Sequence, residues 1–293
     1  MPTRPLADVL TDWYPTAARD LPWRRPGVDP WAVLVSEVML QQTPVARVVP
    51  AWEAWLRRWP TPAALAADAP GDAVRMWDRL GYPRRALRLH AAAVAVVELH
   101  GGVLPRTVPE LLALPGVGDY TARAIAAFAY RQRVPVVDTN VRRVVARAVE
   151  GRADAPVTRR DLALVESLLP TDPEAAATAS IAVMELGALI CAARAPRCER
   201  CPLREQCAWN AAGKPALDVP VRRAQTWAGS DRQVRGRLLQ VLRDSADPVR
   251  ADELAGAWDD PVQRRRALDA LVADGLIDPL PDGRYALPYG RPA

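Results

Sequence analysis

Residues 111–129 read LLALPGVGDYTARAIAAFA, in which the short turn LPGVG joins two stretches with helical periodicity. Glycine can adopt positive φ there and leave neighbouring backbone amides uncovered. Amides at the start of a helix suit a phosphate oxygen. The stretch therefore predicts a helix-hairpin-helix unit that contacts the nucleic-acid backbone, although glycines at helix junctions are also common caps. The residues expected at the phosphate are Leu114, Gly116, Val117 and Gly118.

All four cysteines of the chain follow this unit, in the order C-x6-C-x2-C-x5-C: Cys191, Cys198, Cys201 and Cys207. The start MPTRPLADVL lacks the apolar segment of a secretory signal, so we expect reduced thiols in the cytoplasm. Four thiolates satisfy either tetrahedral zinc or an iron–sulfur cluster. Zinc sites usually carry paired C-x2-C hooks and this run has one, so the spacing favours a cluster over zinc or unliganded thiols.

The charge balance is consistent with a nucleic-acid partner. The chain has 39 Lys and Arg residues against 34 Asp and Glu, a net charge of +5, and Lys214 is its only lysine. Such an excess suits nucleic acid, but a solvated Arg-rich surface explains it equally well. No apolar run of membrane-spanning length occurs. We therefore expect a soluble cytoplasmic protein with no membrane partner.

Periodicity predicts a mainly α fold for residues 1–207, with the clearest helices at 31–42, 86–100 and 121–130. Residues 208–232 are polar and broken by Pro and Gly, which is typical of a linker. Two short helices at 234–243 and 251–258, a third capped by Asp260, and the hairpin LIDPL-PDG-RYALP should follow. This order predicts a winged-helix-like α+β unit at residues 233–293.

Three arginines, Arg264, Arg265 and Arg266, stand near the start of the third helix of that unit, where they could meet duplex phosphates. The alternative is an ordinary packing module with no DNA contact.

Two acidic residues stand where catalysis could use them. Asp138 follows the apolar run VPVV where a helix begins, so it is either an N-cap or a functional carboxylate. Glu37 lies in the apolar helix VLVSEVMLQQT, where packing alone explains a carboxylate poorly. Burial raises the pKa of a carboxyl, as a general acid near neutral pH requires.

Together the segments resemble the MutY family of adenine-mismatch DNA glycosylases, within the helix-hairpin-helix glycosylase superfamily. The carrying segments are LPWRR, SEVMLQQT, RLGYPRRA, LPGVGDYTARAI, VVDTNVRRV, MELGALIC and the cysteine run. The resemblance implies a two-lobed all-α core with an iron–sulfur cluster loop at residues 191–207, holding a 4Fe-4S cluster rather than zinc. It also implies a monomeric bacterial enzyme, nucleoid-associated on DNA, that flips out and excises adenine mispaired with 8-oxoguanine or guanine in duplex DNA, leaving an abasic site.

The same resemblance suggests individual roles. Glu37 is similar to the acid that protonates adenine, and Asp138 to the carboxylate that stabilises the oxocarbenium-like sugar. Tyr120 resembles the active-site tyrosine and Asn140 a residue that orders the site. Three more residues are similar to those that contact DNA: Arg24 in the adenine pocket, and Gln42 and Tyr82 as wedges in the base stack.

Relatives that also cut the strand use a lysine where this chain has Tyr120, so we expect a monofunctional glycosylase. The chain departs from the family at Ile181, where a Glu or Gln usually contacts adenine, at Pro83 and Thr139, and at its C-terminal end, where longer members carry a Nudix-like domain. One alternative function is a thymine-mismatch or other base-specific glycosylase, against which Glu37 argues. The other is a non-catalytic DNA-binding iron–sulfur protein, which the presence of both acids disfavours.

Overall fold

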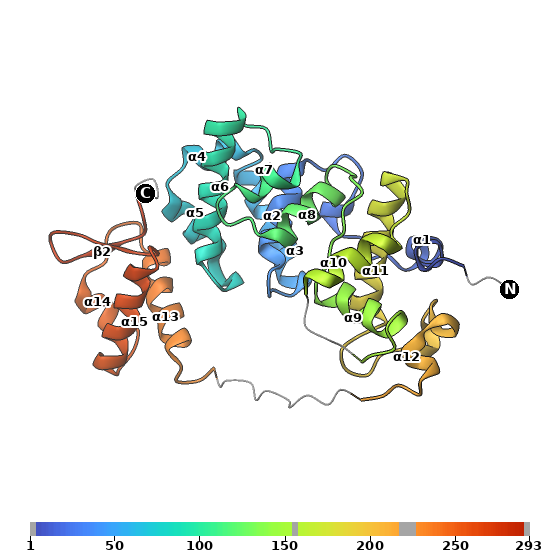
Figure 1. Ribbon diagram of the computed structural model, residues 1–293. Coiled ribbons are helices and arrows are strands. Elements are labelled where there is room, and N and C mark those ends of the chain that lie inside the picture. Colours follow the sequence, from blue (N-terminus) through green and yellow to red (C-terminus); the bar gives the residue numbers. More distant parts are fainter. Residues whose placement is uncertain (1–3, 154–157, 217–226, 290–293) are drawn as a thin grey trace. The chain divides into compact units, whose positions relative to one another are not determined.

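The computed structural model describes residues 4–153, 158–216 and 227–289 and is mainly helical, as the sequence predicted (Figure 1). Two compact units are interleaved along the chain. Unit 1 comprises residues 1–33, 106–112 and 118–221, and unit 2 comprises residues 34–105, 113–117 and 222–293. Of the expected linker and C-terminal unit, residues 217–226 and 290–293 lie outside the described residues.

Unit 1 has its core between α1, α9 and α11, and α9 and α11 lie side by side (Figure 1). The apolar residues Val141, Val144, Val145 and Ala148 recur at helical spacing on α9 and face this core. The elements of the unit are α1 Leu6–Ala17, η1 Pro22–Arg24, α7 Val108–Leu112, α8 Asp119–Phe128, α9 Thr139–Ala148, α10 Arg159–Leu168, α11 Pro173–Leu189, η3 Cys198–Arg200, η4 Arg204–Gln206 and α12 Ala208–Ala211.

The first part of unit 2 packs α6 against α4 and α5. Three fully buried tryptophans support this packing: the ring centroids of Trp55 and Trp59 are 4.6 Å apart, and those of Trp55 and Trp77 are 5.6 Å apart, both in edge-to-face geometry. The elements are α2 Pro30–Leu40, whose first four residues belong to unit 1, α3 Val45–Arg58, α4 Pro62–Ala67, α5 Pro70–Trp77, η2 Asp78–Leu80 and α6 Arg84–His100.

The C-terminal segment, residues 227–289, has the predicted order of three helices and a hairpin. Asp260 caps the third helix as expected, since its carboxylate accepts the Val262 and Gln263 N–H groups. The hairpin strands are only two residues long and pair antiparallel, with Asp278 opposite Ala286. The elements are α13 Asp231–Asp244, α14 Ala251–Ala255, α15 Pro261–Ala273, β1 Asp278–Pro279 and β2 Tyr285–Ala286.

Within unit 2 the C-terminal segment packs against α5. The Arg75 guanidinium donates to the Ser245 carbonyl at 2.7 Å, and the Arg243 Nε donates to the Val74 carbonyl at 2.9 Å. The Gly71 N–H donates to the Pro288 carbonyl, and a Cβ at Gly71 would lie only 2.7 Å from that oxygen. Glycine is therefore required for this close approach.

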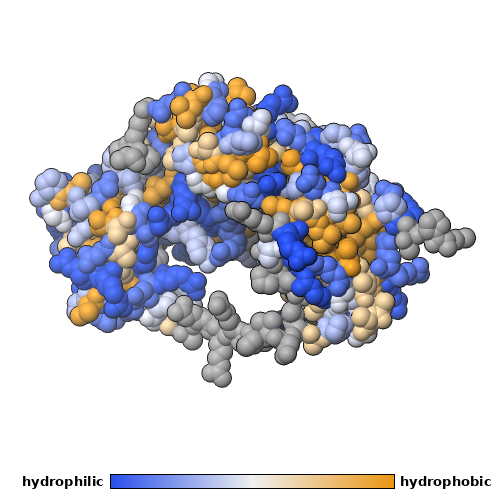
Figure 2. Space-filling model, viewed as in Figure 1, coloured by the Kyte–Doolittle hydropathy of each residue, from blue (hydrophilic) through white to orange (hydrophobic). Residues whose placement is uncertain are grey.

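Hydrophilic and apolar residues alternate over the face of the molecule seen in Figure 2. Within the described part of the chain, no helix is both long and apolar enough to cross a membrane.

Candidate active site

Asp138 is the N-cap of α9. Its Oδ1 accepts the Val141 N–H at 2.7 Å, and its Oδ2 accepts the Asn140 side-chain amide, also at 2.7 Å. Burial raises the pKa of Asp138, and the hydrogen bonds from Val141 and Asn140 together with the charge of Arg143 partly offset that effect. The capping interpretation is thus correct for one oxygen, whereas the contact of the other with Asn140 goes beyond what a cap requires.

A chain of hydrogen bonds continues from Asn140 to the first cysteine. The buried Arg143 donates from Nη2 to the Asn140 Oδ1 at 2.7 Å and to the Gly187 carbonyl at 2.8 Å, and from Nε to the Cys191 carbonyl at 2.7 Å. A Cβ at Gly187 would lie 2.7 Å from the Asn140 Cβ, so glycine lets α11 approach α9 closely. Asn140 therefore has its position fixed on both sides.

The other three cysteines act on the thiol of Cys201. Burial together with the charges of Cys191, Cys207 and Cys198 raises the pKa of Cys201 to about 11, and a backbone hydrogen bond at Leu203 partly offsets this effect. Arg147 Nη1 lies 3.4 Å from the Cys191 sulfur, and its guanidinium stacks on Trp209 at 4.6 Å from the ring centroid. Among residues 4–153, 158–216 and 227–289, no group of three or more His, Cys, Asp or Glu side chains is arranged to hold a metal ion.

Glu185 is a buried carboxylate that the sequence analysis did not include in the site. Its side chain has no exposed surface, and it accepts the Arg19 Nε at 2.6 Å and the Arg24 Nη1 at 2.7 Å. Burial alone would raise the pKa of Glu185, but hydrogen bonds from Arg19 and Arg24 and the charge of Arg24 lower it to about 2. A carboxylate in the apolar helix of MELGALIC is the same signal that identified Glu37.

The predicted pocket residue Arg24 is therefore held by an ion pair in unit 1. Tyr120 lies on α8 and packs against the apolar cluster of Ala124, Ala127 and Val136. Ile181 is half-buried on α11.

Glu37 is buried as the sequence predicted, with 6% of its surface exposed. It lies on α2, in the part of that helix that belongs to unit 2. The neighbouring residues Ser36 and Val38 are also buried, so this part of the apolar helix lies in the protein interior.

The hairpin turn differs in detail from the expectation. Gly116 has φ of +75°, and a Cβ there would lie 2.6 Å from the Arg88 Cβ, so glycine is required. Gly118, the N-cap of α8, has an extended backbone with φ of −93° and open space around the Cβ position. Leu114 and Val117 are buried, so their side chains anchor the turn, and the Val117 N–H donates to the Leu114 carbonyl at 3.1 Å.

Gln42 and Tyr82, the predicted wedge residues, are both exposed and both have positive φ, at 57° and 48°. Each therefore has a left-handed backbone conformation that residues other than glycine rarely adopt.

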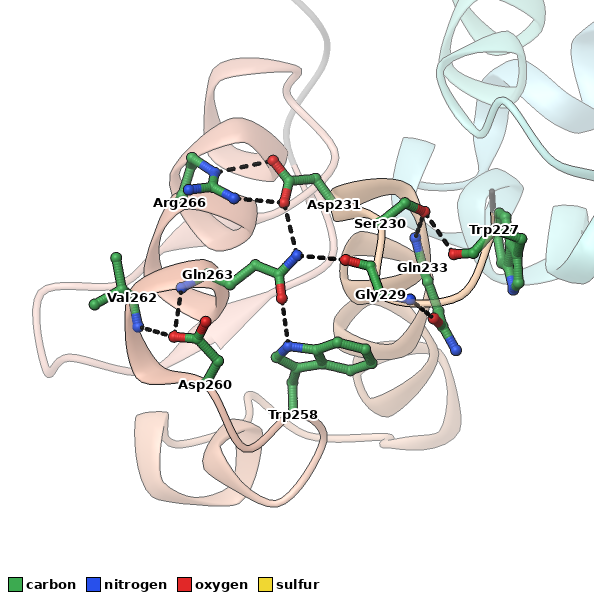
Figure 3. Close-up of polar contacts among 10 residues, drawn as sticks. All are labelled: Trp227, Gly229, Ser230, Asp231, Gln233, Trp258, Asp260, Val262, Gln263 and Arg266. Carbon is green, nitrogen blue, oxygen red and sulfur yellow. Dashed lines mark hydrogen bonds and ion pairs between the residues drawn. The ribbon is translucent and has the colours of Figure 1, made fainter. Parts of the chain in front are cut away.

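Two of the three arginines on α15 have partners inside the C-terminal segment, and Figure 3 shows one of them, Arg266. Arg266 forms a two-point ion pair with Asp231, with N–O distances of 2.7 and 2.9 Å. Arg264 donates to the Trp258 carbonyl, whereas Arg265 is exposed. Contact of this helix with duplex phosphates stays a prediction, in which Arg265 is the arginine that is exposed without a partner named above.

The chain is similar in sequence and fold to known proteins. A family model described as "HhH-GPD superfamily base excision DNA repair protein" matches residues 35–167. An adenine DNA glycosylase of Mycolicibacterium smegmatis is 58% identical over 289 residues, which cover 97% of this chain and 98% of the relative. The human adenine DNA glycosylase is 42% identical over 209 residues, covering 68% of this chain and 38% of the human protein. The solved structure of a thermostable thymine-DNA glycosylase is similar at 26% identity, with a TM-score of 0.64 over 70% of this chain and 95% of that one.

The helical fold and these matches define a base excision DNA repair protein of the HhH-GPD superfamily. Within it, the chain belongs to the family of adenine DNA glycosylases, which confirms the resemblance to the MutY family. The M. smegmatis match spans almost the whole chain, so the C-terminal region is shared with that relative, whereas the human match covers 68% of this chain.

Proposed function

We propose that this protein hydrolyses the N-glycosidic bond of adenine mispaired with 8-oxoguanine or guanine in duplex DNA and leaves an abasic site. Family membership supports adenine as the base that is removed. The observation that carries the mechanism is the half-buried Asp138, whose carboxylate is fixed by a backbone amide on one oxygen and by Asn140 on the other.

Glu37 supplies the proton. Adenine leaves poorly as an anion, and protonation of a ring nitrogen turns it into a neutral leaving group. A buried carboxyl is suited to this role because desolvation favours its protonated form. The 6% exposure of Glu37 meets that condition.

Asp138 stabilises the positive charge that develops on the sugar as the bond breaks. A fixed negative charge in a site with little water acts strongly on a developing cation and needs no reorganisation during the reaction. The donors Val141 N–H and Asn140 Nδ2 favour the ionised form of Asp138, and Arg143 holds Asn140 in place.

The reaction should stop at base removal. Strand cleavage through a Schiff base needs an amine nucleophile. Lys214 is the only lysine of the chain, and it is exposed beyond α12 rather than on the helices that carry Asp138 or Tyr120. The protein therefore acts as a monofunctional glycosylase.

We also propose that Cys191, Cys198, Cys201 and Cys207 ligate a 4Fe-4S cluster. The donor set fits by its chemistry, since four thiolates complete such a cluster, although the described side chains are not gathered in a metal-binding arrangement. Support comes from the sequence spacing of the four cysteines and from Arg147, whose positive charge lies 3.4 Å from the Cys191 sulfur. A cluster bound there would cross-link residues 191–207, and Arg143 joins this loop to Asn140 through the Cys191 carbonyl.

Asp138→Asn tests the mechanism, because Asn caps a helix about as well as Asp but carries no charge. We expect base release in single turnovers to fall by at least about 10²-fold, with only a modest fall in the melting temperature because the amide keeps the cap but cannot accept from Asn140 as well. Release within a few-fold of the unchanged protein would reduce Asp138 to a cap. Asp172→Asn is the matched control, since Asp172 caps α11 through the Ala175 N–H and should leave base release unchanged.

A further inference from the structure

Two turns of unit 2 carry strained residues at their exposed positions. Gln42 follows α2 and Tyr82 follows η2, and both have left-handed backbones although neither is glycine. Tyr82 also exposes half of its surface to solvent, at 50%. Residues in this conformation persist only where the surrounding structure holds them there.

One buried side chain, Arg85, binds both turns. On the side of Gln42, its Nη1 donates to the carbonyls of Val38, Met39 and Gln41 at 2.8, 3.0 and 2.6 Å. On the side of Tyr82, its Nη2 donates to the Gly81 carbonyl at 2.9 Å. The carbonyls of Gln41 and Gly81 each belong to the residue directly before a strained one.

The Arg85 guanidinium also contacts two aromatic rings and one hydroxyl group. Its central carbon lies 5.1 Å from the Trp77 ring centroid and 5.6 Å from that of Tyr82. The Thr43 hydroxyl accepts from Arg85 Nη2 at 3.0 Å and donates to the Leu80 carbonyl at 3.2 Å, which joins the two turns a second time. A planar fork with several donors is needed here, and a lysine ammonium cannot replace it.

We infer that Arg85 is a positioning residue for base extrusion, which presets Gln42 and Tyr82 for entry into the DNA stack. The inference rests on the proposed function, because the wedge role of Gln42 and Tyr82 comes from the family resemblance. Because the two turns are already ordered before DNA binds, insertion of Gln42 and Tyr82 loses less conformational entropy. The extruded state of the base is therefore more populated.

The test compares extrusion with chemistry. A duplex with 2-aminopurine opposite 8-oxoguanine becomes more fluorescent when the base leaves the stack. For Arg85→Lys, which keeps the positive charge, we expect the rate of this fluorescence rise to fall roughly tenfold, because the two left-handed turns lose their common support. The pH profile of base release from the extruded state should keep its shape, since Arg85 does not transfer a proton.

Arg243→Lys is the matched control. Burial lowers the pKa of both Arg85 and Arg243 to about 10, but the Arg243 side chain donates to Val74 on α5 rather than to either turn. Both variants should lower the melting temperature, and only Arg85→Lys should slow extrusion. Equal extrusion rates in the two variants would overturn the inference. If the unchanged protein neither extrudes 2-aminopurine nor releases adenine, the proposed function itself fails.

Discussion

Replacement of Glu185 by Gln tests the buried ion pair that holds Arg24. Burial favours a higher pKa for Glu185, but Arg19 and Arg24 outweigh it and lower the pKa from its usual value of 4.5 to about 2. A difference of this size corresponds to about 3 kcal/mol of folding free energy at neutral pH. Loss of one partner from a buried pair typically costs about 3–5 kcal/mol, which agrees with that figure. Glu185→Gln should therefore destabilise the protein by about 3 kcal/mol at pH 7.

The contribution of Glu185 to the free energy of unfolding depends on pH. Because folding lowers the pKa of Glu185, its stabilising contribution is complete above the unfolded value of 4.5 and is lost as pH falls towards 2. At pH 3 the difference between the two proteins should shrink to about 1 kcal/mol. Urea unfolding of both proteins at pH 7 and pH 3 measures it.

Glu174→Gln provides the control on the same helix. Glu174 pairs with Arg131 at the surface, so its replacement should change stability little at either pH. A difference between Glu185→Gln and the unchanged protein that is equally large at pH 7 and pH 3 would refute the reasoning, because the destabilisation would then come from packing rather than from charge.

Three further predictions concern the cofactor, the chemistry and the C-terminal segment. Anaerobically purified protein should be yellow-brown with about four irons per chain, and stoichiometric zinc without iron would contradict the cluster. Borohydride should trap no covalent complex with DNA, since Lys214 is the only lysine; efficient trapping would instead indicate a Schiff base. A chain ending at Ala228 should keep the ratio of excision rates opposite 8-oxoguanine and guanine, because Arg264 and Arg266 have partners within the C-terminal segment. It should melt at a lower temperature, because Arg75 and Gly71 lose their hydrogen bonds to Ser245 and Pro288. A changed ratio would show that the segment reads the opposite base.

The local features of the fold could be predicted from the sequence. The helical periods of α2, α6 and α8 were visible in the apolar pattern, and the structure extends or shortens each by only a few residues. Asp138 could be placed at the start of a helix and Asp260 at another, because capping depends on neighbours in the chain.

Contacts between distant residues could not be predicted in this way. Glu185 meets Arg19 and Arg24 from more than 160 positions along the chain, and no local pattern encodes that pairing. The same holds for Arg85. In the sequence it is one of two adjacent arginines in GYPRRA, and only the structure shows its hydrogen bonds to the Gln41 and Gly81 carbonyls of both turns. The sequence also did not reveal the partners of Arg264 and Arg266. Tertiary packing brings Trp258 and Asp231 to these two arginines.

One experiment directly tests whether the protein excises adenine by means of Glu37. Single-turnover base release is measured on duplexes with A opposite 8-oxoguanine, A opposite guanine and T opposite guanine, for the unchanged protein and Glu37→Gln. We predict release of adenine from the first two duplexes and none of thymine, and a loss of about 10²- to 10⁴-fold in the variant with binding retained. Thymine release, or adenine release by Glu37→Gln at the unchanged rate, would contradict the account.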